Sequence, residues 1–265
     1  IDSWIEEGCK KRSARPNLKI EITTNTKLIS VMWANNEVGT LQPLEKIMAI
    51  AKEHQIPVHT DAVQAAGKVP ISIKSLDVDF LTLSSHKLYA PRGVGVLYAK
   101  NHDQLNPLLT GGHHERGMRA STENLIGIVA LGKAITLLNP TEFEKKMSKQ
   151  RQTLVSMLKD QINDLHIHTP LNNSIANTLC VGIEGVEGHA LAMNCDLEGI
   201  EISTGSACST GAIEPSSVLK AMGISDTINK SSIRISLGQP TTAEEINKVG
   251  QILPELAKQS KEGIR

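Results

Sequence analysis

Lys87 follows a short apolar run, Phe80–Leu83, and stands beside His86 and two serines. The run predicts a buried strand, and a lysine at the carboxyl end of such a strand loses hydration, which favours the neutral amine. A neutral amine is what a Schiff base with a carbonyl compound requires. The pattern therefore admits a Schiff-base lysine. The structural alternative is a lysine that extends from the strand end to solvent.

Asp61 lies 26 residues before Lys87 and also follows a predicted strand, Pro57–Thr60. An aspartate at this place could hold a pyridine nitrogen protonated and so make pyridoxal phosphate an electron sink. The alternative is an N-cap for a helical segment beginning at Ala62. Gln64 lies one turn further on and could contact the same ligand, or could be a solvated helix residue.

Cys208 stands in a small, polar, glycine-flanked stretch, 202–211, which predicts an exposed loop. A cysteine in such a loop suits a nucleophile better than a packing residue. Cys180 and Cys195 lie in an apolar strand pattern and an amphipathic helix pattern, and we expect both to be inert core residues. Cys9 lies in an N-terminal segment without a clear pattern.

Arg234 alternates with apolar residues in the run 231–238, which predicts a strand ending near a glycine turn. Its guanidinium could clamp a carboxylate with two parallel hydrogen bonds. The alternative is an exposed cross-strand charge.

The histidines give weaker signals. His113 and His114 precede Glu115, but no third ligand stands at a spacing that favours a metal site. His166 and His168 alternate along a predicted strand, and we expect them on a solvent-facing side of it.

These reactive residues need strands and helices to position them, and the sequence predicts an α/β fold. Apolar runs predict strands at Leu28–Trp33, Pro57–Thr60, Phe80–Leu83 and Gly93–Ala99, and Pro43 opens an amphipathic helix. Ligands of such sheets bind at the carboxyl ends of the strands. Three polar clusters stand there, namely Asn35 with Asn36, Asp61, and His86 with Lys87.

Asn139-Pro140 predicts a domain boundary, with residues 1–139 in a large cofactor-binding domain and 140–265 in a smaller C-terminal α/β domain. A capping box at Thr141–Glu144 predicts the start of a long helix. A second helix start stands at Thr241 and Thr242, three residues before two glutamates.

Composition excludes several classes of protein. The 265 residues carry 28 basic and 28 acidic side chains, so no net charge attracts nucleic acid or an anionic membrane. The sequence has no run of 18 apolar residues, so it predicts no membrane-spanning helix. The four cysteines form no Cys-x-x-Cys pair, which indicates a reducing, cytoplasmic compartment.

Six stretches of the sequence, taken together and in their order along the chain, resemble the NifS/IscS class of cysteine desulfurases. That class belongs to the class V aminotransferases, which are pyridoxal 5'-phosphate enzymes of the aspartate-aminotransferase fold (fold type I). The resemblance implies a large domain with a mixed, mostly parallel sheet and a smaller domain that carries the Cys208 loop. The stretches are Val31–Gly39, His59–Gln64, Ser84–Lys87, Gly111–Arg119, Ser203–Cys208 and Ile233–Gly238.

The resemblance implies roles for the residues at the predicted cofactor site. Lys87 would bind pyridoxal phosphate as a Schiff base, and Asp61 would pair with the pyridine nitrogen. Gln64 would contact the ring hydroxyl. Ser84 and His86 would hold the phosphate.

Other roles concern the substrate and the partners. Asn36 would lie between the ring oxygen and the substrate carboxylate, which Arg234 would clamp. Cys208 would take sulfur from L-cysteine as a persulfide, leaving L-alanine, and deliver it to an iron–sulfur scaffold or another acceptor protein. Thr122 would reach the phosphate of a neighbouring subunit, which implies a homodimer.

Some features depart from the family pattern. Family members carry a further N-terminal portion, before the position of residue 1, with a Gly-Ala-Thr phosphate loop and a histidine that stacks on the cofactor ring. No such motifs occur in this sequence. Ala120-Ser121-Thr122 stands where the family has Ser-Gly-Thr or Ala-Gly-Thr, which we expect to alter the loop. Two alternatives stay open: a selenocysteine lyase or related β-lyase, and a truncated chain that only binds partners.

Overall fold

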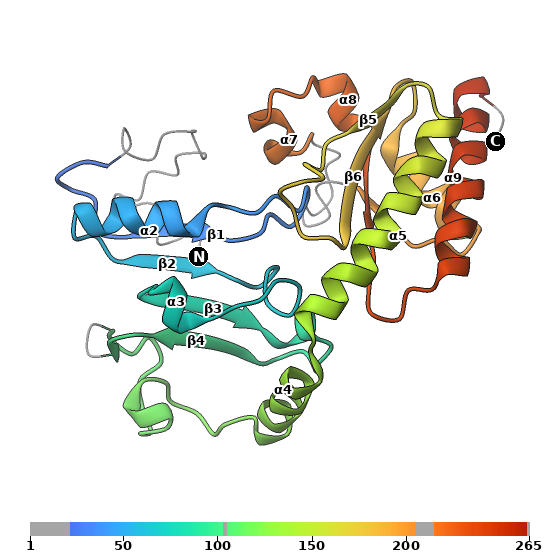
Figure 1. The fold of residues 1–265 in the computed structure, drawn as a ribbon. Coiled ribbons are helices and arrows are strands. Elements are labelled where there is room, and N and C mark those ends of the chain that lie inside the picture. The colour runs from blue at the N-terminus through green and yellow to red at the C-terminus, as the bar shows by residue number, and fades with distance from the viewer. Residues whose placement is uncertain (1–21, 103–104, 205–214, 264–265) are drawn as a thin grey trace.

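The computed structural model describes residues 22–102, 105–204 and 215–263, which contain two four-stranded sheets (Figure 1). In the first sheet three neighbouring strands are parallel and the fourth is antiparallel. This mixed, mostly parallel sheet confirms the predicted fold class. Its strands, in spatial and chain order, are β1 (Ile29–Met32), β2 (Val58–Asp61), β3 (Phe80–Ser84) and β4 (Gly95–Ala99).

The register of the parallel strands aligns their carboxyl ends. Asp61, the last residue of β2, pairs with Met32 at the end of β1 and with Thr82 near the end of β3. The three polar clusters predicted from the sequence therefore leave adjacent strands at one edge of the sheet. This confirms their expected placement.

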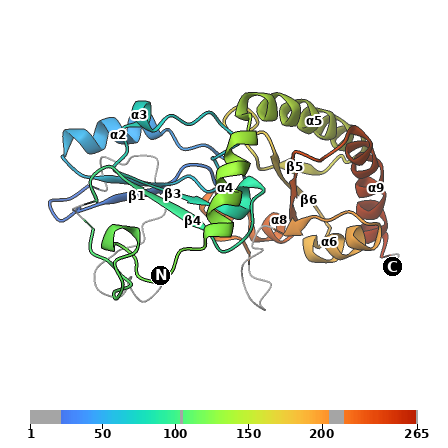
Figure 2. The same cartoon turned by 90° about the horizontal axis from the view of Figure 1, so that it is seen from below.

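The helices of the first half are α2 (Leu44–Glu53), α3 (Ile73–Leu76) and α4 (Leu125–Leu137), with short 3-10 turns η2 (Ser85–Leu88) and η4 (Glu115–Gly117). Figure 2 shows α2 and α3 on the same face of the first sheet. The buried side chain of Ala51 on α2 packs there against Ile29 and Val58.

α4 is apolar on several faces and buries few of its side chains. Ile126 is 85% exposed and Val129 is 70% exposed. Within the described residues no single helix is long and apolar enough to cross a membrane.

The second sheet is antiparallel throughout and has the strand order β5, β6, β8, β7. Its strands are β5 (Leu165–Ile167), β6 (Thr178–Ile183), β7 (Ser203–Thr204) and β8 (Ser232–Ser236). α4 ends two residues before Asn139, and the chain bends by 70° into the next helix. The predicted division of the chain at this point stays a prediction.

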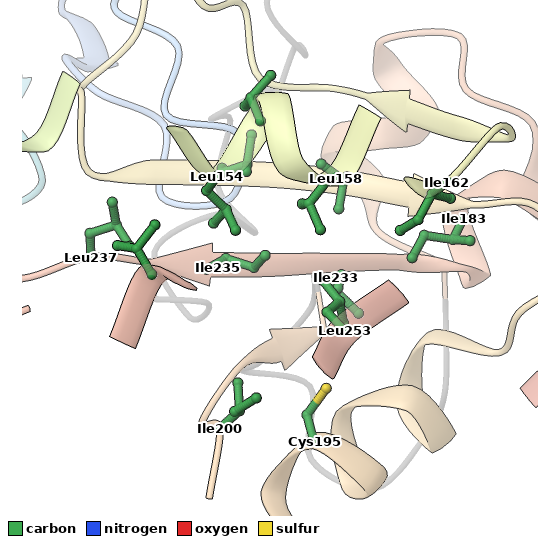
Figure 3. Close-up of a cluster of buried hydrophobic side chains, with 14 of the residues drawn as sticks. Leu154, Leu158, Ile162, Ile183, Cys195, Ile200, Ile233, Ile235, Leu237 and Leu253 are labelled. Atoms are coloured by element: carbon green, nitrogen blue, oxygen red, sulfur yellow. The ribbon is translucent and has the colours of Figure 1, made fainter. Parts of the chain in front are cut away.

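Helices cover both faces of the second sheet (Figure 1). They are α5 (Pro140–Gln161), α6 (Gly188–Leu197), α7 (Ser217–Ala221), α8 (Asp226–Lys230) and α9 (Ala243–Glu262). Leu154 and Leu158 of α5 lie against Ile233 and Ile235 of β8, and Leu253 of α9 joins them in a shared buried cluster (Figure 3).

The starts of the two long helices test the predicted caps. Thr242 and Glu245 form a capping box at the start of α9, which confirms the prediction there. The box predicted at Thr141–Glu144 is wrong. α5 begins at Pro140, and the side chain of Asn139 accepts the hydrogen bond from the backbone N–H of Glu142. The asparagine side chain caps the helix, and the following proline has a backbone φ already close to the helical value.

The expectation that His166 and His168 face solvent is wrong for His168. His166 is exposed, but His168 is only 6% exposed. Its Nε2 lies 3.0 Å from the hydroxyl of Ser232, and that hydroxyl also lies 2.6 Å from the carbonyl of Ile228. The strand pattern ends at Ile167, so alternation no longer governs the next residue.

Candidate active site

The loop after β1 meets the second sheet through a tight turn. The Asn35 side chain accepts hydrogen bonds from the backbone N–H groups of Glu37 and Val38, each at 2.9 Å. Gly39 has φ +76°, and a Cβ there would lie 3.1 Å from the Cβ of Thr178 on β6. Glycine is thus required at this close approach. The turn fixes the backbone between the two sheets.

Asp61 fills a structural role with one oxygen only. Its Oδ1 accepts a hydrogen bond of 2.8 Å from the backbone N–H of Val63, which resembles the capping alternative. Its Oδ2 accepts no hydrogen bond from any described residue. One carboxylate oxygen thus stays available to a ligand at the end of β2.

His59 links the three parallel strands behind Asp61. Its Nδ1 lies 2.8 Å from the hydroxyl of Ser30, and its Nε2 lies 3.3 Å from that of Thr82. Burial lowers the pKa of His59, and the nearby Asp61 charge opposes this shift.

The turn after β3 carries the predicted phosphate and Schiff-base residues. The hydroxyl of Ser84 lies 2.9 Å from Nδ1 of His86, so these two form a pair. Lys87 is exposed within η2, so the loss of hydration expected from the sequence is not found here. Tyr89 ends the turn, and its hydroxyl accepts a hydrogen bond of 2.8 Å from the backbone N–H of Gln239.

Sequence reasoning missed the desolvated lysine of this site, which is Lys68. Its Nζ donates a hydrogen bond of 2.7 Å to Oε1 of Gln64. Burial lowers the pKa of Lys68 to about 8, and the charges of Lys87 and Arg234 add to this effect. The available signal was a lysine four residues after Gln64 in a run of small and apolar residues.

Arg234 projects from β8, one of the two central strands of the second sheet, where it pairs with Cys180 on one side and Ser203 on the other. Its Nη1 donates a hydrogen bond of 2.9 Å to the backbone carbonyl of Asn36. Its Nε is buried and has no hydrogen-bond partner among the described residues. Arg234 is half-buried between the two sheets, so the alternative of an exposed cross-strand charge is wrong.

Glu37 links the loop after β1 to the start of α7. It accepts a hydrogen bond from the hydroxyl of Ser216, the N-cap residue of α7. Burial raises the pKa of Glu37, while the hydrogen bond from Ser216 and the charge of Arg234 act in the opposite direction.

The charge of this cluster indicates the ligand it suits. Lys68 is electrostatically coupled to Lys87 and Arg234. None of the three forms an ion pair with a carboxylate among the described residues. Three cations, a serine–histidine pair and one available carboxylate oxygen fit a ligand that carries a phosphate, a carboxylate and a protonated ring nitrogen. The residues present therefore fit pyridoxal phosphate together with an amino acid.

Two predicted site residues are not among the contacts described above. Thr122 is exposed in the loop before α4. Cys208 lies outside the described residues. Cys180 and Cys195 are fully buried, and burial raises their thiol pKa values to about 12 and about 11. The expectation that these two are core residues is confirmed.

The loop from Leu105 to Asn124 holds several residues in the left-handed region. Glu115 and Arg116 have φ values of 47° and 57°, and Ser121 has φ 94°. Ser121 stands where the resembled family has glycine, and the backbone keeps a conformation that favours glycine. The described residues hold no group of three or more His, Cys, Asp or Glu side chains placed to bind a metal ion.

Comparison with known proteins defines the class of this fold and site. The model of the aminotransferase class-V family matches residues 10–249, so the chain belongs to that family. Enzymes of this family in general use pyridoxal phosphate.

Particular relatives are proteins named cysteine desulfurase IscS. One from Clostridium botulinum is 42% identical over 250 residues, covering 93% of this chain and 63% of the relative. One from Methanosarcina thermophila is 44% identical over 241 residues, covering 90% and 59%. A solved structure called a NifS-like protein has a TM-score of 0.84 at 38% identity, covering 91% and 64%. The resemblance to NifS/IscS desulfurases is confirmed, and the chain spans about three fifths of these relatives.

Proposed function

We propose that this chain forms most of the active site of a cysteine desulfurase that converts L-cysteine to L-alanine. The carrying observation is that Arg234 of the second sheet is fixed to the loop that follows β1, beside the strand ends that bear Asp61 and Lys87. The names of the relatives support the same activity.

The residues divide the work of binding. Ser84 and His86 would hold the cofactor phosphate and Lys87 its carbonyl carbon, while Asp61 would keep the ring nitrogen protonated. When bound, pyridoxal phosphate supplies an electron sink for charge that develops on the substrate. Arg234 would bind the substrate carboxylate through its donors other than the one given to Asn36.

Sulfur transfer needs a nucleophile, and we assign this role to Cys208. Its thiolate would attack the sulfur of L-cysteine, forming an S–S bond as the C–S bond breaks. The electron pair of that bond stays with the substrate carbon, which takes a proton and becomes the methyl group of alanine. One cysteine and one thiol thus yield one alanine and one persulfide, and no external oxidant is needed.

We extend the proposal to the partners of the reaction. The persulfide would pass to an iron–sulfur scaffold or another acceptor protein, in a reducing, cytoplasmic compartment. Thr122 would contact the cofactor phosphate of a second subunit, so we propose a homodimer. Its exposure in the loop before α4 agrees with a contact outside its own subunit.

The test uses purified chain with pyridoxal phosphate, L-cysteine and a thiol reductant. Two preparations are assayed. One is the chain alone, and the other is the chain co-expressed with the part of a relative that the chain does not span. We expect Schiff-base absorbance and equal amounts of alanine and sulfide. Lys87→Ala should lose the absorbance. Cys208→Ala should keep it and lose sulfide, whereas the control Cys9→Ala should keep both.

Two results would contradict the proposal. Absence of both absorbance and alanine in each preparation would indicate a chain that only binds partners. Alanine formed from L-selenocysteine but not from L-cysteine, independently of Cys208, would indicate a selenocysteine lyase.

A further inference from the structure

Lys68 is the one group of the cationic cluster to which the proposed reaction assigns no role. It lies at the end of the turn after β2, directly after Gly67. A Cβ on Gly67 would lie 3.1 Å from side-chain carbons of Leu88 and Leu138. Packing therefore fixes the backbone at Gly67, and with it the position of the Lys68 backbone.

The ammonium group of Lys68 stands in an unfavourable place. It is desolvated and lies near two other cations, Lys87 and Arg234. Its side-chain hydrogen-bond partner in the described structure is neutral, the Gln64 amide at 2.7 Å. Removing an ammonium group from water without an anionic partner is costly. Such an arrangement needs a compensating use, and an anionic ligand would supply one.

The hydrogen bond also decides which way the Gln64 amide is turned. A lysine ammonium donates and cannot accept, so the amide atom facing it must be the oxygen. The amide nitrogen then lies on the other side of the group. Within the described residues neither of its N–H donors has a partner. Gln64 is thus set to donate, and not to accept, toward a ligand.

We infer that Lys68 is a positioning residue, which holds Oε1 of Gln64 so that the Gln64 amide presents N–H donors to an ionised hydroxyl oxygen of the ligand. The inference deepens the proposed function, in which Gln64 contacts the ring hydroxyl of pyridoxal phosphate. A fixed donor favours the ionised oxygen, because an un-ionised hydroxyl could also use an amide oxygen as its acceptor. Lys68 would therefore select the form of the ligand without touching it.

The restraint on Gln64 should depend on pH. Lys68 loses its proton as pH rises through about 8, and the neighbouring charges that bear on it are Lys87 from η2 and Arg234 from β8. Above that pH a neutral amine no longer excludes the opposite orientation of the amide. The restraint on Gln64 is expected to be strong near pH 7 and weak near pH 9.

The first test needs no cofactor. Side-chain amide signals of Gln64, assigned by their loss in Gln64→Ala, are followed by NMR against pH in the cofactor-free protein. We expect a midpoint near 8 in the wild type and none in Lys68→Met. Lys68→Arg should keep the signals in the low-pH position throughout. Wild-type signals that do not titrate, or that titrate unchanged in Lys68→Met, would overturn the inference.

The second test measures ligand selection. Lys68→Met and Gln64→Ala should each weaken binding of pyridoxal phosphate about tenfold, since a hydrogen bond to a charged group is lost. Binding of the analogue without the ring hydroxyl should not change. The double variant should be no weaker than Gln64→Ala, because the two residues act as one unit. Additive losses would overturn the inference.

A matched control is Lys248→Met. Lys248 also donates a short side-chain hydrogen bond, to the carbonyl of Glu198, but lies on α9 away from the cluster. It should leave both readouts unchanged. If the wild type does not bind pyridoxal phosphate, the proposed function fails, while the Gln64 signals still decide the role of Lys68.

Discussion

Arg234 and Asn36 are 198 residues apart in the chain, yet the guanidinium of Arg234 donates a hydrogen bond of 2.9 Å to the Asn36 carbonyl. Arg234 lies in β8 and Asn36 in the loop that follows β1, so this bond fixes the second sheet to the strand ends of the first. It also uses one guanidinium donor and orients the others. The position of Arg234 is thus set before any substrate binds, which reduces the entropy lost on binding.

Arg234→Lys should separate binding from later steps. Lysine keeps the charge but loses the planar donor set, so the KM for L-cysteine should rise at least tenfold with a smaller change in kcat. The free energy of unfolding should fall by about 1–3 kcal/mol, because a partly buried charged hydrogen bond is lost. Steady-state kinetics and urea denaturation measure the two effects. The control Arg92→Lys concerns an exposed arginine and should change neither.

Ser121→Gly should stabilise the protein. Ser121 has φ 94°, a region that strains residues with a Cβ, and glycine relieves this strain. We expect the free energy of unfolding to rise by up to about 1 kcal/mol in urea denaturation. Ser72→Gly is the matched control, since Ser72 has φ −126° and makes no side-chain cap hydrogen bond. The control should lower stability, and an equal gain in both variants would contradict the strain argument.

Acid should destabilise the fold through His168. Burial lowers its pKa below 6.5, so the unfolded chain binds a proton more readily than the folded protein does. Stability should therefore be full above about pH 7 and decline as pH falls below 6.5. His59 has a pKa lowered in the same direction and adds to this decline.

His168→Gln tests this contribution. The Ser232 hydroxyl has one proton, which goes to the Ile228 carbonyl, so His168 Nε2 must donate to Ser232. A glutamine amide nitrogen retains that donor without titrating. Urea denaturation at pH 7.5 and pH 5.5 should show a smaller loss in the variant than in the wild type. If the variant loses as much stability as the wild type between pH 7.5 and pH 5.5, groups other than His168 cause the acid sensitivity.

Thiol labelling should distinguish the buried, unreactive cysteines from Cys208. Because burial raises the thiol pKa values of Cys180 and Cys195 to about 12 and about 11, neither should react with iodoacetamide at pH 8 in the folded protein. Cys208 should react readily if it is the nucleophile. Peptide mass spectrometry quantifies each site, with denatured protein as the positive control. Native labelling of Cys180 would show that the interior between the sheets opens.

The sequence predicted the parallel strands and the polar residues at their ends because both depend on local patterns. Asp61 and Lys87 each follow a short apolar run, and such runs identify strand ends without knowledge of the rest of the fold. The capping box at Thr242 was found for the same reason, since its two hydrogen bonds join residues three apart.

Contacts between distant segments were beyond such patterns. Nothing near Lys68 indicated that Arg234 would lie close enough to affect its charge, and nothing near His168 indicated that Ser232 would cover it. Asn139 displaced the predicted cap because two capping residues competed within three positions. Burial and long-range pairing decided each of these cases.

The buried cluster around β6 and β8 has a consequence for the order in which the molecule opens. It joins residues from Phe143 to Ala257 in one cluster, whereas the first sheet rests on several smaller ones. Backbone amides of β6 and β8 should therefore exchange hydrogen only on global unfolding, and those around Asp61 and Lys87 by smaller openings. A ligand bound at the strand ends would close these openings by mass action and slow exchange there selectively.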